Sequence, residues 1–334
     1  MLRLASSWVW DMWFADDGER FHVFFLKASR ALQDPDRRHG RASVGHAVSD
    51  DLVHWTELPD ALVASDSPAL DDQAIWTGSV VRGDDGTWWM FYTGIERASS
   101  SSSGEANTQR VLAATSPDLL VWTRTDVLVE PDPGSYETKE TSLWDHQAWR
   151  DPFVCRDGRG GWRMLLTARA SSGDAWDRGV VGLATSPDLR HWTVHPPASP
   201  SGSGFGQLEV LQLAEVEGRP VLVFSCLSPE LSDARRAAGV AGGVWAAPQA
   251  SPDPPYDLSS ARLLLDDSFY VGRLVRDRSG AWQVLAFVNR LPEGSPDGPP
   301  GAFGGTLTDP MPVTWSPDGT LRVRPPQLLR GSGG

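Results

Sequence analysis

Short hydrophobic runs alternate with polar turn sequences along nearly the whole chain. Nine runs are rich in β-branched and aromatic residues, as strands are: residues 21–26, 79–82, 88–92, 162–167, 180–184, 208–213, 220–224, 242–247 and 281–287. Glycine-containing pairs that favour hairpin turns separate many of them: residues 17–18, 85–86, 160–161, 217–218 and 279–280. No long amphipathic helix is predicted, and residues 234–238 are expected to form only a short one. The pattern therefore predicts an all-β protein.

A ten-residue phrase, Ala-x-Ser-x-Asp-Leu-x-x-Trp-Thr, occurs at residues 47–56, 114–123 and 184–193. A weaker copy lies at 250–253, and residues 315–319 are either a further weak copy or only a turn. The full copies start 67 and 70 residues apart, a period that fits one propeller blade with its loops. Since 334 residues divided by this period gives five, we expect a five-bladed β-propeller with four antiparallel strands per blade. The Ser and Asp side chains can bond the backbone of a turn, so the phrase is interpreted as scaffold.

The repeat continues through the chain, which favours one closed unit over two domains. Residues 1–330 are therefore expected to form a single propeller domain, and residues 331–334 a flexible tail. Stretches rich in Ser, Gly and Pro at 99–107, 196–206 and 292–301 predict long surface loops. Such loops project from the ends of a propeller, where we expect them to rim a central cleft.

Composition narrows the range of partners. The formal charge of −13 repels phosphate backbones and anionic membranes, so neither nucleic acid nor a membrane is expected as a partner. The 16 tryptophans suit blade packing and the apolar faces of sugar rings, which favours a neutral small-molecule ligand. Cys155 and Cys226 lie in apolar strand patterns and are expected to be buried free thiols. No signal peptide or membrane span is recognised, so the expected location is the cytoplasm, and the oligomeric state stays open.

Three acidic residues stand out because their neighbours in sequence indicate that the carboxyl group is buried, which is normally unfavourable. Asp11 is surrounded by aromatic and aliphatic side chains, and desolvated acids of this kind cluster at functional sites. Asp151 lies between Arg150, which can pair with it, and a proline that fixes the backbone. Glu209 lies in an apolar strand run that is expected to raise its pKa towards that of a proton donor. Each acid also has a purely structural interpretation. Asp11 can bond backbone amides at a strand end, the Arg-Asp-Pro of Asp151 is a weak signal by itself, and Glu209 can face solvent from an outer strand.

The three acids fall at comparable points of successive repeats, near the innermost strand, where a propeller brings its blades together. Three carboxylates beside tryptophans are typical of a glycosidase, in which one acid attacks the sugar or orients water and another protonates the leaving oxygen. No histidine directly adjoins the three acids, so neither a metal ion nor a cofactor is expected at this site, and whether a structural calcium lies in the propeller channel stays open. A propeller that only binds a glycan or a protein is the alternative if the acids lie on separate faces.

The chain resembles the five-bladed propeller glycosidases that act on fructosyl groups, glycoside hydrolase families 32 and 68, over nearly its whole length. Residues 9–13 are similar to the Val-Trp-Asp-x-Trp nucleophile segment of levansucrases, and residues 76–79 to their Trp-Ser-Gly-Ser. Residues 150–152 match the Arg-Asp-Pro that both families share. The strand of Glu209 and residues 269–275 are closer to the invertases of family 32.

The chain also departs from the invertase pattern. It lacks their Asn-Asp-Pro-Asn-Gly around the nucleophile, and Leu26 stands where a substrate-binding glutamine is expected. No C-terminal β-sandwich is expected after the propeller. The resemblance is therefore a mosaic of the two families.

The resemblance implies a retaining β-fructofuranosidase that cleaves sucrose or short fructo-oligosaccharides. It makes Asp11 the nucleophile, Glu209 the acid and base, and Asp151 a non-reacting stabiliser of the transition state. The substrate-binding residues that it implies are Trp10, Trp13, Trp76, Thr77, Ser79, Arg150 and Tyr270. A retaining enzyme is expected to hold the two reacting carboxyl groups about 5–5.5 Å apart. The alternatives are fructosyl transfer of the levansucrase or inulosucrase type and inverting cleavage of arabinofuranosides or xylosides, as in family 43.

Overall fold

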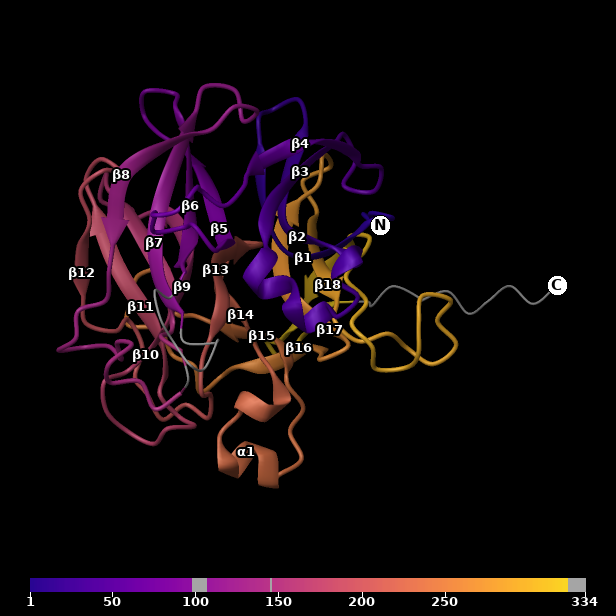
Figure 1. Cartoon of the computed structure of the whole chain (residues 1–334). Coiled ribbons are helices and arrows are strands. Elements are labelled where there is room, and N and C mark those ends of the chain that lie inside the picture. The colour runs from indigo at the N-terminus through magenta and orange to yellow at the C-terminus, as the bar shows by residue number, and fades with distance from the viewer. Residues whose placement is uncertain (98–106, 145, 324–334) are drawn as a thin grey trace.

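Twenty strands form five four-stranded antiparallel sheets in the computed structural model, which describes residues 1–97, 107–144 and 146–323 (Figure 1). Within each sheet the strands follow one another in chain order, so each blade is one continuous segment. The first strands of the five blades, β1, β5, β9, β13 and β17, contact one another in a ring around the central axis. The predicted five-bladed β-propeller with four antiparallel strands per blade is confirmed.

The strands, four to a blade, are β1 (Ser7–Asp16), β2 (Phe21–Ser29), β3 (Ser43–Ser49), β4 (Thr56–Leu62), β5 (Ala74–Arg82), β6 (Trp88–Glu96), β7 (Thr108–Ser116), β8 (Thr123–Val129), β9 (Trp149–Arg156), β10 (Trp162–Arg169), β11 (Gly179–Ser186), β12 (Thr193–His195), β13 (Glu209–Val216), β14 (Arg219–Cys226), β15 (Gly243–Pro248), β16 (Arg262–Asp266), β17 (Phe269–Arg276), β18 (Trp282–Val288), β19 (Met311–Trp315) and β20 (Leu321–Val323). The helical segments are short: the 3₁₀ helices η1 (Arg30–Leu32), η2 (Pro35–Arg41) and η3 (Ser228–Glu230), and the α-helix α1 (Asp233–Ala237).

The strand predictions from the sequence agree with these elements. All nine predicted runs lie within a strand or begin one residue before one, and the short helix expected near residue 234 is α1. The predicted loops at 196–206 and 292–301 join β12 to β13 and β18 to β19. Most of the third loop and the predicted tail at 331–334 lie outside the described residues.

The repeated phrase is the turn between the third and fourth strands of a blade. In the first copy, Ser49 Oγ accepts hydrogen bonds from the backbone N–H groups of Asp51 at 3.1 Å and Leu52 at 2.9 Å. The indole Nε1 of Trp55 donates to the carbonyl oxygen of Leu52 at 3.1 Å. The leucine of every full copy has a left-handed φ of 66–68°, which these side-chain bonds hold in place. Both weaker copies fall at the same third-to-fourth-strand turn, so the phrase is scaffold in all five blades.

Hydrophobic side chains pack between neighbouring blades and form the core. The ring closes where the first and last blades meet. There Val9 donates its backbone N–H to Gly305 O at 3.0 Å, and Leu307 donates its own to Leu2 O at 3.0 Å. Because blade 1 contacts both blade 2 and blade 5, the two ends of the described chain stabilise each other.

Two smaller expectations can also be compared with the structure. Both cysteines are free thiols, but only Cys226 is buried, whereas Cys155 is half-buried. Among the described residues, no helix is both long and apolar enough to span a membrane.

Each innermost strand carries one extra residue relative to its partner, which is a β-bulge, at the same level of the ring. Four of these bulges contain a residue with a left-handed φ: 26° at Asp11, 56° at Asp151, 52° at Val210 and 52° at Val271. Aspartate visits this region only occasionally and valine rarely, so the surrounding packing must hold this conformation. A bulge bends the strand and re-aims its side chains, and here it directs them towards the axis.

The bulge of blade 2 allows a stability test at Gly78. A Cβ at this position would overlap the main-chain carbonyl oxygen of Phe91, which belongs to the paired strand β6 and cannot move without breaking the ladder. We expect Gly78→Ala to lower the free energy of unfolding by about 1–3 kcal/mol, measured by urea denaturation. The control is Gly134→Ala, where the nearest atom to an added Cβ is 3.5 Å away, and the expected change is below about 0.5 kcal/mol. Equal effects at both glycines would contradict this account.

Candidate active site

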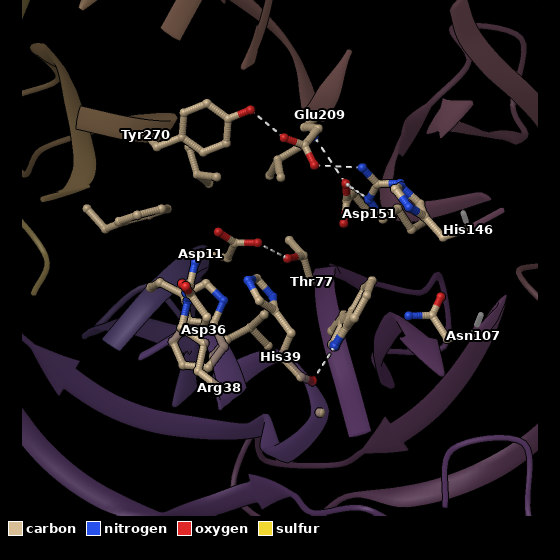
Figure 2. Close-up of a pocket in the computed structure, with 18 of the residues that line it drawn as sticks. Asp11, Asp36, Arg38, His39, Thr77, Asn107, His146, Asp151, Glu209 and Tyr270 are labelled. Carbon is tan, nitrogen blue, oxygen red and sulfur yellow. Dashed lines mark hydrogen bonds and ion pairs between the residues drawn. The ribbon is translucent and has the colours of Figure 1, made fainter. Parts of the chain in front are cut away.

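A cavity of about 960 Å³ lies on the propeller axis, and each blade contributes two consecutive residues to it. These bulge pairs are Trp10–Asp11, Trp76–Thr77, Arg150–Asp151, Glu209–Val210 and Tyr270–Val271. The arrangement brings the carboxyl groups of Asp11, Asp151 and Glu209 into one cavity from blades 1, 3 and 4 (Figure 2). The sequence predicted this convergence, but its placement of the acids in successive repeats is wrong, because blade 2 carries Thr77 at the equivalent position.

A second, smaller cavity of about 310 Å³ is lined by residues two positions further along each innermost strand. They are Trp13, Ser79, Phe153, Gln212 and Arg273. A strand advances by about 3.3 Å per residue, so these side chains lie roughly 6–7 Å further along the axis than the acids.

Two of the predicted substrate-binding residues therefore lie away from the acid cavity. Trp13 is buried and stacks on Phe24, with ring centroids 6.3 Å apart. Ser79 Oγ accepts a hydrogen bond from the backbone N–H of Val154 at 3.1 Å and so joins blade 2 to blade 3. Their assignment to a sugar subsite beside the acids is corrected to a structural role in the ring. The other five predicted residues, Trp10, Trp76, Thr77, Arg150 and Tyr270, do line the acid cavity.

One hydrogen bond orients the Asp11 carboxyl group in the cavity, and nearby charges affect its pKa. The Thr77 hydroxyl donates to Asp11 Oδ2. Burial, and then the charge of Asp151, raise the pKa of Asp11 to about 7, while the Thr77 bond and Arg38 act in the opposite direction. Asp11 is therefore poised between its acid and carboxylate forms near neutral pH.

Asp151 is almost completely buried, with 3% of its surface exposed. The Thr167 hydroxyl donates to Asp151 Oδ2 at 2.7 Å, and the backbone N–H of Val210 approaches the same oxygen at 3.4 Å. Burial raises the pKa of Asp151 although Arg150, 3.4 Å from the carboxylate, favours the ionised form. These contacts fix the orientation of this carboxyl group.

Glu209 has polar partners on both carboxylate oxygens. Arg150 Nη2 lies 2.6 Å from Oε1, and the Tyr270 hydroxyl donates to Oε2. The expectation of an apolar environment for this carboxyl group is therefore wrong. Leu208 and Leu211 pack into the core, and Val210 lines the cavity, but the bulge turns the Glu209 side chain towards the axis and its polar partners.

Arg150 connects the acids to each other. Burial lowers the pKa of its guanidinium, but the charges of Glu209 and Asp151 outweigh burial and raise it, so the group is a permanent cation. Its Nη2 also donates to Gln207 Oε1 at 2.5 Å. Glu230 lies in the same cavity, where burial and the charge of Glu209 raise its pKa to about 7.

Several lining residues were not found from the sequence. Arg38 and His39 belong to η2, which follows β2 and covers one wall of the cavity, and Trp76 Nε1 anchors this segment by donating to His39 O at 2.8 Å. Glu230 belongs to η3. Neither segment has strand periodicity or a motif, so no sequence signal marked them. The predicted loops at 196–206 and 292–301 contribute no lining residue.

In the part of the chain that the structure describes, no group of three His, Cys, Asp or Glu side chains is arranged to hold a metal ion. The donors gathered in the cavity are carboxyl groups paired with arginine, tyrosine and threonine. Such a set can perform nucleophilic attack and proton transfer on a bound sugar.

Comparison with known proteins identifies the family. The model of the glycosyl hydrolases family 32 N-terminal domain matches residues 13–325. The chain belongs to glycosyl hydrolase family 32. The family resemblance noted from the sequence is thereby confirmed. The match begins two residues after Asp11, so the place of Asp11 in this family 32 site rests on the geometry of the cavity.

Curated relatives of this family 32 chain include β-fructofuranosidase 1 of Zea mays, 30% identical over 192 residues, which are 54% of this chain and 28% of the relative. Sucrose-6-phosphate hydrolase of Escherichia coli is 29% identical over 183 residues, which are 54% of this chain and 32% of the relative. The matched segments thus span about a third of the length of these relatives.

Solved structures share the fold of the family 32 chain. An inulosucrase from Halalkalicoccus jeotgali bound to kestose has a TM-score of 0.75 at 22% identity and covers 97% of this chain and 89% of its own. The catalytic domain of a Microbacterium saccharophilum K-1 β-fructofuranosidase has a TM-score of 0.72 at 18% identity, over 96% and 81% of the two chains. At these identities the likeness supports the fold alone.

The raised pKa of Asp11 makes a prediction about stability. A carboxyl group whose folded pKa is about 7 disfavours folding once the unfolded chain ionises, and this penalty grows until the pH passes 7. We expect Asp11→Asn to raise the Tm at pH 8 by about 3 °C or more, and by less at pH 5. Calorimetry at the two pH values checks this. The control, Asp126→Asn at an exposed position on β8, should show no such pH dependence. A Tm gain that is larger at pH 5 would contradict it.

Proposed function

We propose that this family 32 chain is a retaining glycosidase that cleaves β-fructofuranosides, with sucrose or short fructo-oligosaccharides as substrates. The proposal rests on one observation, that Asp11, Asp151 and Glu209 share a single cavity although they lie far apart in sequence. Acids on separate faces would have favoured a propeller that only binds a glycan or a protein. Trp76, a partly exposed tryptophan that lines the cavity, offers apolar surface to a sugar ring, whereas the Trp10 side chain is buried behind the acids.

In this proposal the reaction proceeds in two displacements. The carboxylate of Asp11 attacks the anomeric carbon of the fructosyl group, the glycosidic C–O bond breaks, and Glu209 gives its proton to the leaving oxygen. Glu209 then removes a proton from water, which attacks the same carbon and releases Asp11. Thr77 fixes the Asp11 carboxyl group, and Arg38 favours its ionised form.

The two partners of Glu209 suit its change of role. Arg150 holds Oε1 and Tyr270 holds Oε2, so the carboxyl group keeps one orientation in both steps. The glutamate must be protonated for the first step and ionised for the second. The carboxyl group of Glu230 lies in the same cavity, where burial and the charge of Glu209 raise its own pKa.

Asp151 does not form a bond to the substrate in this proposal. Its side chain is fixed by Thr167 and by the backbone of Val210. A carboxylate in this position bonds fructosyl hydroxyl groups and stabilises the positive charge that develops on the ring in the transition state.

Fructosyl transfer is the second candidate, because an inulosucrase bound to kestose shares the fold over 97% of this chain. Transfer uses the same covalent intermediate, with a sugar hydroxyl in place of water. The ratio of free fructose to glucose released from sucrose separates the two: equal amounts indicate hydrolysis, and a deficit of fructose with new oligosaccharides indicates transfer.

Incubation with sucrose, with kestose and with an aryl arabinofuranoside tests the proposal. We expect turnover of the fructosides, and Asp11→Ala should reduce it by more than about a thousandfold because the covalent path is lost. Asp126→Ala, at an exposed position, is the matched control and should retain activity. Cleavage of the arabinofuranoside without any fructoside turnover would refute the substrate assignment.

The pH dependence provides a second test. Since Asp11 must be ionised to attack and its pKa is about 7, kcat/KM should fall as the pH drops below about 7. Replacing Thr77 by valine removes a hydrogen bond that favours the ionised form, so this acid limb should move to higher pH. A profile that stays flat down to pH 5 would contradict the assignment of Asp11 as nucleophile.

A further inference from the structure

Arg273 lies on β17 and lines the second, smaller cavity. It follows the bulge of blade 5 by two residues, and only 3% of its surface is exposed. Its guanidinium lies 5.9 Å from the ring of Phe153 in blade 3. A long charged side chain is thus buried among the innermost strands, one level below the acids.

The guanidinium of Arg273 ties together the two blades that carry the reacting carboxyl groups. Its Nε donates to Met12 O at 3.1 Å, and its Nη1 donates to Leu211 O at 2.7 Å. Met12 directly follows Asp11, and Leu211 is two residues after Glu209. Both carbonyl groups belong to the bulged segments, so one planar group spans the axis between the two bulges.

The same group is a cation without an ion pair. Among the described residues, no carboxylate lies within 4.0 Å of it, and its Nη2 has no hydrogen-bond partner. Burial lowers the pKa of Arg273 to about 10, while Asp151 and Asp11 act to raise it, so the group stays charged at neutral pH. A buried, unpaired cation is unfavourable for folding, and the only charges that compensate it here are the acids of the cavity.

We propose that Arg273 is a positioning residue for the reaction, which fixes the spacing of the Asp11 and Glu209 bulges and places a positive charge beneath the carboxylates. This proposal rests on the proposed function for its catalytic consequence. Arginine suits the task because its planar fork can donate to two carbonyl groups at once, whereas a lysine ammonium has no such rigid spacing.

The charges that act on Asp11 are those of Asp151 on β9, Glu209 on β13, Arg38 in η2 and Arg273 on β17. Other titratable groups that line the same cavity are Asp36 and His39 of η2, Arg150 of β9 and Glu230 of η3. The two acids disfavour a charged Asp11, and the two arginines favour it. Removal of the Arg273 charge should therefore raise the pKa of Asp11. Removal of its two hydrogen bonds, to Met12 O and Leu211 O, should make the bulges less rigid without changing that pKa.

Two substitutions separate these effects. Arg273→Lys keeps the charge but cannot hold both carbonyl groups, so we expect kcat to fall by about 10–100-fold, with the acid limb of the pH profile in place. Arg273→Gln removes the charge, so we expect a similar fall in kcat together with an acid limb about one pH unit higher. The control is Arg276→Gln, an exposed arginine three residues along the same strand, which should leave both quantities unchanged.

The outcomes discriminate clearly. If both Arg273 variants lower only the Tm, and kcat and the acid limb stay within twofold and about 0.2 units of wild type, Arg273 is purely structural and the proposal is wrong. If Arg273→Gln does not fold, Arg273→Lys alone decides, since wild-type kcat in that variant overturns the proposal. Titration of the Asp11 carboxyl carbon by NMR in Arg273→Gln measures the charge effect without any substrate. A protein that cleaves no fructoside refutes the proposed function, whereas an unshifted Asp11 pKa in Arg273→Gln refutes the charge effect of Arg273, and an unchanged kcat in Arg273→Lys refutes its positioning effect.

Discussion

The site depends on one backbone constraint, the β-bulge that every innermost strand carries at the same level. A regular strand would send consecutive side chains to opposite faces, so only one of each pair would reach the axis. The bulges place both in the cavity, and they hold Asp11 and Asp151 at left-handed φ angles that non-glycine residues seldom adopt. This local strain persists because the packed ring of blades over-determines the backbone around it.

The second requirement is charge. Three carboxyl groups in a partly buried cavity repel one another when they are ionised. Burial is the largest cause of the raised pKa of Asp11 and of Asp151, and neighbouring carboxylates raise both further. Arg150 offsets this repulsion through direct ion pairs with both Asp151 and Glu209. Arg38 and Arg273 act at longer range, one from η2 at the wall of the cavity and one from β17 within the ring. The protein therefore concentrates both charge signs at its axis.

Scaffold and chemistry occupy different parts of the same repeat. The turn between the third and fourth strands keeps nearly one sequence in three blades, because its hydrogen bonds serve the same purpose in each. The bulge pairs occupy equivalent places, yet they read Trp-Asp, Trp-Thr, Arg-Asp, Glu-Val and Tyr-Val. The five blades are alike at the turns that stabilise the fold and differ at the residues that line the cavity, so a symmetric ring builds an asymmetric site.

The period of the repeated turn determined the number of blades, and the aromatic setting of Asp11 and the Arg-Asp-Pro at Asp151 marked two of the acids, since these signals are local in sequence. Only the tertiary structure decided which neighbours of the acids share their cavity. Trp13 and Ser79 lie in the right motifs but one level further along the axis, because two residues of strand move a side chain past the bulge. Arg38, Glu230 and Arg273 come from other segments of the chain and act on the acids through their charges, and no local pattern in the sequence encodes such an interaction between blades.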